Sequence, residues 1–413
     1  MADSAPSSPS ARTVGVFSLP VLVCAFGYFV DVYDIWVFAS TRNASLRDLG
    51  FTGDQLFEQG VYLLNMQMGG LFLGGLVFGI LGDRIGRTKM MFASILTYSL
   101  ATFLNAFVGD IHSYAALRFV AGLGLAGELG LAITLIGELL PTEKRGYGTG
   151  MVVGCGVLGA AAAGAMAHLV SWQDCYIIGG VFGFVLLAFR LKVGESTLYL
   201  RQRYDKTRGR ISMLWQSRAR LTRFVQCIAL ITPIWFVAGI LITFSTDIAA
   251  QRGDAVIATA TMLIWFNIVM ASGDFASAWI SQFLQTRRKV IIACTLLSAF
   301  MSGFVLLWPY PLSETGVLIS YCLLGAGCGV WVLAITAAAE SFGTNLRATV
   351  TTAVPNFARA MTIPMTLGVS ALKPYLGLPK AALAIGVLVF IAALWAVIRL
   401  PETVHQDLNF REE

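Results

Sequence analysis

The sequence predicts an all-α membrane protein in which twelve transmembrane helices form two pseudo-symmetric six-helix bundles around a central cavity. The composition, the apolar runs and an internal repeat lead to this prediction. Of the 413 residues, 57% are hydrophobic and 13% are charged, whereas ordinary globular chains have about 45–50% and about 25%. This composition excludes a cytosolic enzyme, a disordered scaffold and a disulfide-stapled secreted domain.

Twelve apolar runs make up most of the chain. Each is long enough for a spanning helix, because about 20 mostly apolar residues cross about 30 Å of hydrocarbon. In chain order the expected spans are residues 14–39, 59–81, 90–109, 113–140, 146–168, 175–194, 223–246, 256–284, 289–308, 314–340, 349–371 and 378–400. The first run carries acids, so it predicts a spanning helix and not a cleaved signal peptide.

Six spans lie on each side of one long polar segment, so the chain divides into five expected parts. These are a cytoplasmic N-terminal tail (1–13), an N-terminal six-helix bundle (14–194), a basic cytoplasmic linker (195–222), a C-terminal six-helix bundle (223–400) and a cytoplasmic C-terminal tail (401–413).

The basic residues predict the orientation. Ten Lys and Arg residues fall between Arg190 and Arg223, and others follow spans two, four, eight and ten, all on one face. The other face would hold only Arg42, Arg47, Arg252, Lys373 and Lys380. Because Lys and Arg concentrate in cytoplasmic loops, we expect a multi-pass plasma-membrane protein (a bacterial inner membrane) with both termini in the cytoplasm. The net charge of +6 then reflects topology and anionic lipid, and no nucleic-acid partner.

Cysteine and histidine are too scattered for a metal site. The seven cysteines include no Cys-x-x-Cys pair, and there are three histidines. Zinc and iron–sulfur sites need clusters of these residues, so we expect no metal, no other cofactor and no enzymatic activity. The cysteines are expected to be small buried hydrophobic residues.

An internal repeat relates the two sets of spans. Leu131-Ala-Ile-Thr134 recurs as Leu333-Ala-Ile-Thr336, at an offset of 202 residues. The same offset pairs Gly127 with Gly329, Glu138 with Glu340, and Arg145 with Arg347. Paired helical halves around a central cavity are the basis of alternating access in secondary transporters.

Four segments carry a family resemblance. Residues 79–89, which read GILGDRIGRTK, resemble the loop signature of the major facilitator superfamily in the correct loop. Residues 118–124, residues 141–146 after Glu138, and Leu400-Pro-Glu402-Thr403 resemble its further motifs. The resemblance implies the major facilitator fold and a proton- or gradient-coupled carrier.

The resemblance also implies a gate. Asp83, Arg84 and Arg87 would latch the loop to the cytoplasmic ends of other helices. Glu138, Arg145, Glu340 and Arg347 would complete the charge network. The second copy has Gln282 and Thr286 in place of the loop acid and base, so gating is expected to be asymmetric. The alternative for all these residues is topogenic charge on a solvated loop.

Charged residues inside the spans indicate where transport chemistry lies, because each needs a partner, a cavity or a proton. Asp31 and Asp34 lie three residues apart on one helical face, at a depth where either could pair with Arg118. Glu128 lies deeper. Two carboxylates on one face compete for ionisation, so Asp31, Asp34 and Glu128 are the candidate proton-coupling residues. The alternative is a neutral clamp between Asp34 and Arg118 that never titrates.

The remaining embedded charges concern substrate and structure. Arg118 and Arg359 are taken as the only basic residues within spans, and guanidinium suits a carboxylate. Asp274 is assigned to structure, neutralised by Arg359. Further substrate-binding candidates are Tyr33, Gln67, Trp235, Trp265, Asn267, Trp331 and Asn356. At helical spacing, each of these is also consistent with packing alone.

The first span refines the resemblance. Residues 27–36 resemble the first helix of phosphate:proton and metabolite:proton symporters, and residues 126–128 resemble their helix four. Gly239 and Thr243 stand where phosphate symporters keep an Asp and a Tyr, which disfavours phosphate.

We therefore expect a monomeric, proton-coupled importer of a small anionic organic metabolite. The alternatives are a proton-driven exporter of a drug-like or siderophore-like compound and a membrane receptor that transports nothing. Residues 154–164 lack the proline that drug antiporters carry in helix five, which disfavours export.

Overall fold

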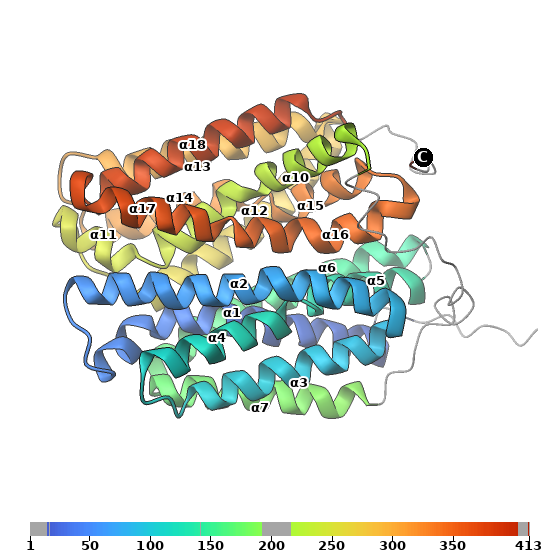
Figure 1. Cartoon of the computed structure of the whole chain (residues 1–413). Coiled ribbons are helices and arrows are strands. Elements are labelled where there is room, and N and C mark those ends of the chain that lie inside the picture. The colour runs from blue at the N-terminus through green and yellow to red at the C-terminus, as the bar shows by residue number, and fades with distance from the viewer. Residues whose placement is uncertain (1–14, 16, 141, 192–215, 404–411, 413) are drawn as a thin grey trace, which may run out of the picture.

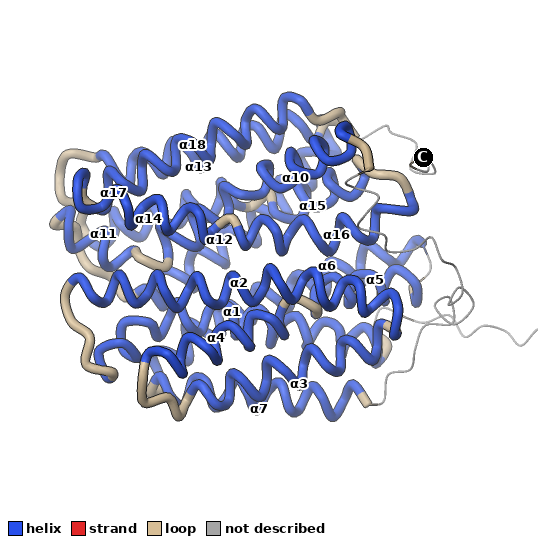
Figure 2. The backbone as a smooth tube through the Cα atoms, in the orientation of Figure 1, coloured by secondary structure: helices blue, strands red, loops and turns tan. Residues whose placement is uncertain are grey.

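The computed structural model describes residues 15, 17–140, 142–191, 216–403 and 412. All regular elements in these ranges are helices, as Figure 2 shows, which confirms the all-α fold class. Most of the expected linker and tails lies outside the described residues.

Each expected span coincides with one helix or with consecutive helices. The first half of the chain contains α1 (Leu19–Asp48), α2 (Asp54–Ile85), α3 (Arg87–Asn105), α4 (Ile111–Leu125), α5 (Glu128–Leu139), α6 (Thr142–Leu169) and α7 (Trp172–Arg190). The second half contains α10 (Arg218–Phe236), the π-helix η1 (Val237–Ile242), α11 (Ser245–Arg252), α12 (Thr259–Leu284), α13 (Arg287–Leu307), α14 (Glu314–Cys328), α15 (Trp331–Glu340), α16 (Thr344–Ala360), α17 (Thr362–Leu376) and α18 (Leu378–Arg399).

Within the described part of the chain, nine spans are long and apolar enough to cross a membrane. Two further expected spans are the pairs α4–α5 and α16–α17, whose separate helices of 12 to 17 residues are each too short to cross alone. The last is α3.

The two halves lie side by side along their length. In Figure 1 the blue-to-green helices α1–α7 form one layer and the yellow-green-to-red helices α10–α18 form the other. Across the boundary α6 packs on α12, and α2 packs on α16 and α17. We call the end that carries the α2–α3 and α12–α13 connections the inner end, following the expected topology, and the opposite end the outer end.

The helix breaks occur at matching places in the two halves. α4 ends at Leu125 and α14 ends at Cys328, and a second helix follows each within three residues. Next to the second break, a Cβ on Gly329 would lie 2.5 Å from the Cα of Gly273 on α12. Glycine is required for this close approach, so the sequence repeat corresponds to a repeated way of packing a broken helix.

At the inner end of the second half, an acid that follows the last helix binds the start of α13. Glu402 accepts hydrogen bonds from the Thr286 hydroxyl at 2.6 Å and from the Arg287 backbone N–H at 3.0 Å. Partial burial alone would raise the pKa of Glu402, but these hydrogen bonds outweigh it and hold that pKa below its usual value. Glu402 therefore supplies an anion at the loop where Gln282 stands in place of the Asp83 of the first copy.

We expect Glu402→Gln to destabilise the protein at neutral pH by about 0.5–1 kcal/mol, a usual loss for a capping acceptor. Because the folded-state pKa is depressed, the stabilisation is present above the unfolded-state pKa of about 4.3 and is lost as the pH falls through the folded value. Thermal unfolding in detergent from about pH 7 to about pH 3 measures this, with the exposed Glu58→Gln as the control. A difference that stays constant over that range would contradict the assignment.

Candidate functional site

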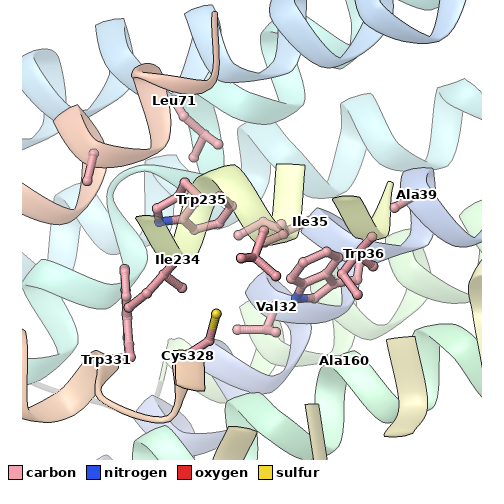
Figure 3. Packing of buried hydrophobic residues seen from close by; sticks show 14 of the residues in the cluster. Val32, Ile35, Trp36, Ala39, Leu71, Ala160, Ile234, Trp235, Cys328 and Trp331 are labelled. Atoms are coloured by element: carbon pink, nitrogen blue, oxygen red, sulfur yellow. The ribbon is translucent and has the colours of Figure 1, made fainter. Parts of the chain in front are cut away.

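A cavity of about 70 Å³ lies between the two halves. Figure 3 shows part of its wall, with Val32, Ile35 and Trp36 of α1 on one side and Trp235 and Trp331 on the other. The lining residues are Tyr28, Val32, Ile35, Trp36, Val153, Gly156, Val157, Ile234, Trp235, Ala238, Phe266, Asn267, Met270, Asp274, Trp331 and Arg359. A mostly apolar and aromatic wall with a few polar groups is typical of a small-molecule site.

Arg359 of α16 is the cation of this cavity. Its side chain is buried, and its guanidinium lies 5.4 Å from the centre of the Trp235 ring. Trp235 in turn packs edge-to-face on Trp331, with 6.2 Å between ring centres. Among the side chains that the structure describes, no carboxylate forms an ion pair with Arg359. The cavity therefore presents a guanidinium against the outer ring of a tryptophan pair.

The expected ion pair between Asp274 and Arg359 is not formed between these two described side chains. Instead, the Asp274 carboxylate accepts a hydrogen bond from the backbone N–H of Val332 at 3.2 Å, in the first turn of α15. The break before α15 leaves N–H groups without a helical partner, and Asp274 satisfies one of them. Asp274 therefore has a structural role, as expected, but it caps α15 and is not neutralised by Arg359.

Asp31 differs from the other embedded acids. It is fully buried, and both carboxyl oxygens lack a hydrogen-bond partner among the protein groups that the structure describes. In sequence it lies between Tyr28 and Val32, which line the cavity, but Asp31 itself is absent from the described lining. The cation that acts most strongly on it is Arg359, from the other half of the molecule.

Asp34 is paired with Arg118 inside the first half. The guanidinium donates to Asp34 Oδ1 at 3.4 Å and to the Asp34 carbonyl at 3.1 Å. Both side chains are buried, and Arg118 also lies 5.5 Å from the centre of the Tyr176 ring. Of the two pairings that the sequence left open for Arg118, the structure forms the one with Asp34.

The structure places the expected substrate-binding residues in two groups. Trp235, Asn267, Trp331 and Arg359 line the cavity. The described lining does not include Tyr33, Gln67, Arg118, Trp265 or Asn356. Tyr33 donates to the Cys175 carbonyl at 2.9 Å, Gln67 is fully buried, and Trp265 is 46% exposed on the surface of α12.

Sequence reasoning missed a second buried ion pair. Arg190, counted above with the cytoplasmic charges, is only 1% exposed and donates to Glu128 Oε1 at 2.9 Å. It also contacts the sulfur atoms of Cys24 and Met91. The statement that Arg118 and Arg359 are the only basic residues within spans is therefore wrong. Arg190 lies inside the apolar run 175–194, and that position was the available signal.

A buried arginine also joins the two halves at the outer end. Arg42 of α1 is 1% exposed, forms an ion pair with Asp247 of α11 and lies 4.5 Å from the centre of the Phe244 ring. The neighbouring Asn43 donates to the Thr246 hydroxyl at 3.0 Å. These contacts close the outer end of the boundary between the halves.

The expected gate is described in part. The side chains of Asp83, Arg84, Arg87, Glu138, Arg145 and Arg347 lie outside those that the structure describes. Glu340 is described, and it forms an ion pair with Arg287 at the inner end of the second half.

The pair of Glu128 and Arg190 predicts a characteristic stability pattern. Arg190→Met leaves a buried carboxylate without its cation, which costs about 3–5 kcal/mol. Adding Glu128→Gln removes the unpaired charge, so the double variant is expected to regain at least half of that loss. Thermal unfolding in detergent measures both, with Arg47→Met, an exposed outer residue, as the control. An Arg190→Met variant as stable as the control would contradict the buried pair.

Comparison with known sequences identifies the group to which the chain is related. The model of the Major Facilitator Superfamily matches residues 24–363. The niacin transporter NiaP of Acinetobacter baylyi is 24% identical over 385 residues, covering 81% of this chain and 82% of that protein. The gentisate transporter of Corynebacterium glutamicum is 25% identical over 345 residues, covering 80% and 75%.

The fold has solved counterparts. The inward-open xylose transporter XylE from E. coli superposes with a TM-score of 0.72 at 15% identity, covering 95% of this chain and 98% of that one. The family model spans most of the sequence, and the helices follow the same arrangement. This chain belongs to the major facilitator superfamily.

Proposed function

We propose that this chain imports a small aromatic monocarboxylate together with a proton. The observation that carries the proposal is the cavity, where the Arg359 guanidinium forms no ion pair with a described carboxylate and lies over the ring of Trp235. Guanidinium binds carboxylates with two parallel hydrogen bonds, and aromatic walls favour a flat ring. The niacin and gentisate transporters among the relatives support an aromatic acid as substrate.

Asp31 is the residue that we propose to carry the coupled proton. Asp34 and Glu128 are already engaged by Arg118 and Arg190, so they support the first half without needing to titrate. Ionised Asp31 attracts Arg359 and competes with a substrate carboxylate. Protonated Asp31 releases Arg359 to the substrate, so the proton and the anion bind together.

Alternating access would expose this site to each side in turn. The pairing of Arg42 with Asp247 closes the outer end, and opening that end requires its separation. At the inner end, Asp83, Arg84 and Arg87, with Glu138, Arg145, Glu340 and Arg347, remain the proposed gate. We assign the outer and inner ends from the expected topology, with both termini in the cytoplasm. One chain contains a complete cavity, as a monomeric carrier requires.

The first test of the proposal is uptake into proteoliposomes under an imposed pH gradient. With the outside acidic, we expect accumulation of at least one of nicotinate, gentisate and benzoate, no accumulation of D-xylose, and collapse of the uptake with a protonophore. Arg359→Gln is expected to raise the KM for the acid at least tenfold. Export driven by the same gradient, or no flux of any acid, would overturn the proposal.

The second test separates the acids. Asp31→Asn is expected to abolish gradient-driven accumulation while counterflow exchange of the acid continues, because a permanently neutral residue 31 leaves Arg359 available but carries no proton. Asp34→Asn is the matched variant, and it is expected to lower stability by breaking the clamp to Arg118. If Asp31→Asn accumulates the acid as the wild type does, Asp31 is not the coupling residue.

A further inference from the structure

Asn356 of α16 makes contacts that a substrate-binding residue would not need. It is 4% exposed and is absent from the described lining of the cavity. Its Oδ1 accepts a hydrogen bond from Arg359 Nη1 at 3.3 Å. Its Nδ2 donates to the carbonyls of Ala126 and Thr352, each at 3.2 Å. Both N–H groups and the oxygen of the amide are therefore engaged by protein groups.

One of these bonds crosses between the halves. Ala126 lies in the break between α4 and α5, where carbonyl groups at the end of α4 lack a helical partner. The amide reaches it because Gly75 of α2 leaves room: a Cβ at Gly75 would lie 2.9 Å from the Asn356 Cβ. Asn356 thus connects the cation of the cavity with the backbone of the opposite half.

The orientation of the amide follows from its partners. The Ala126 carbonyl requires a donor and the Arg359 guanidinium requires an acceptor, so a flipped amide would oppose both. While the Ala126 bond exists, the oxygen of Asn356 is held toward Arg359. Without it the amide keeps only the Thr352 carbonyl of its own helix, so the acceptor that faces Arg359 is held less firmly.

The position of the bond indicates which motion breaks it. Nearer the inner end, Gly130 of α5 packs against Thr352, where an added Cβ would lie 2.3 Å from a Thr352 methyl carbon. On α2, Phe72 packs edge-to-face on Phe357, with 4.9 Å between ring centres. Opening the cavity at its inner end must separate α16 from α5 and α2, and that separation removes the Ala126 bond.

We infer that Asn356 is a positioning residue that makes the affinity of Arg359 for a carboxylate depend on closure of the inner end. This inference rests on the proposed function of Arg359. With the inner end closed, the guanidinium is held ready for the anion. Opening inward releases Asn356 and weakens the hold on the anion, so the substrate leaves into the cytoplasm.

The test compares transport from the two faces. Right-side-out and inside-out vesicles carry wild type, Asn356→Ala, Arg359→Gln or Thr366→Val, and the probe is whichever of nicotinate, gentisate and benzoate gives the highest uptake. Thr366→Val is the matched control, because Thr366 of α17 donates to Asn65 of α2 at 2.6 Å, a bond between the halves that does not touch Arg359. Asn356→Ala is expected to raise the KM from the outside about tenfold and to change the KM from the inside less than twofold.

The outcomes distinguish the inference from its premise. An Asn356→Ala variant with equal increases at both faces, or with no increase, overturns the positioning role. So does a Thr366→Val variant that shows the same one-sided increase, because loss of any contact between the halves would then suffice. If Arg359→Gln leaves the KM at both faces unchanged, the proposed anion site itself is wrong, whatever Asn356→Ala does. Each variant must have the thermal stability of the wild type in detergent.

Discussion

The structure depends on the cost of a charge in the hydrocarbon region of a membrane. One ionisable side chain at the bilayer centre costs at least about 2.5–3.5 kcal/mol. Each such side chain therefore needs a partner of opposite charge. The first half meets it internally, with Asp34 held by Arg118 and Glu128 held by Arg190. Asp31 has no such partner among the described residues, and its strongest cation belongs to the second half. The electrostatic interaction of Asp31 therefore crosses the boundary between the two halves.

The polar backbone obeys the same constraint. In lipid every N–H and C=O group must be satisfied within the protein, so a broken helix needs side chains from elsewhere. Asp274 of α12 serves the start of α15, and Asn356 of α16 serves the end of α4. The second break lies beside the cavity, which Trp331 lines. A helix break therefore does more than bend the helix, because its free backbone groups bind a side chain of a neighbouring helix.

The periodic and compositional features of the molecule were predictable from the sequence. Each expected span coincides with helix, and matching depths on two antiparallel helices limited the partner of Arg118 to Asp31 or Asp34. The burial of Arg190 and the exposure of Trp265 were not predictable. Whether a residue near a helix end faces water, lipid or protein depends on how far the helix extends and which neighbour it packs against, and hydropathy carries neither. Asn356 was placed at the substrate for the same reason: its depth was right, but its direction around the helix axis was unknown.

A charge count explains why coupling would be tight at this site. On the proposed mechanism, Arg359 and ionised Asp31 contribute one positive and one negative charge while no substrate is bound. The loaded cavity, with Asp31 protonated and a carboxylate on Arg359, contains the same two charges. Asp274, which lines the cavity and accepts a hydrogen bond from the Val332 backbone N–H, is not part of this count. An anion without a proton, or a proton without an anion, changes the count by one unit. Such a cavity must then close around an uncompensated charge, which is costly in low dielectric. On this mechanism, a carrier that holds only the proton or only the anion is disfavoured during the conformational change. Uptake of the anion is then coupled to uptake of the proton by charge balance alone.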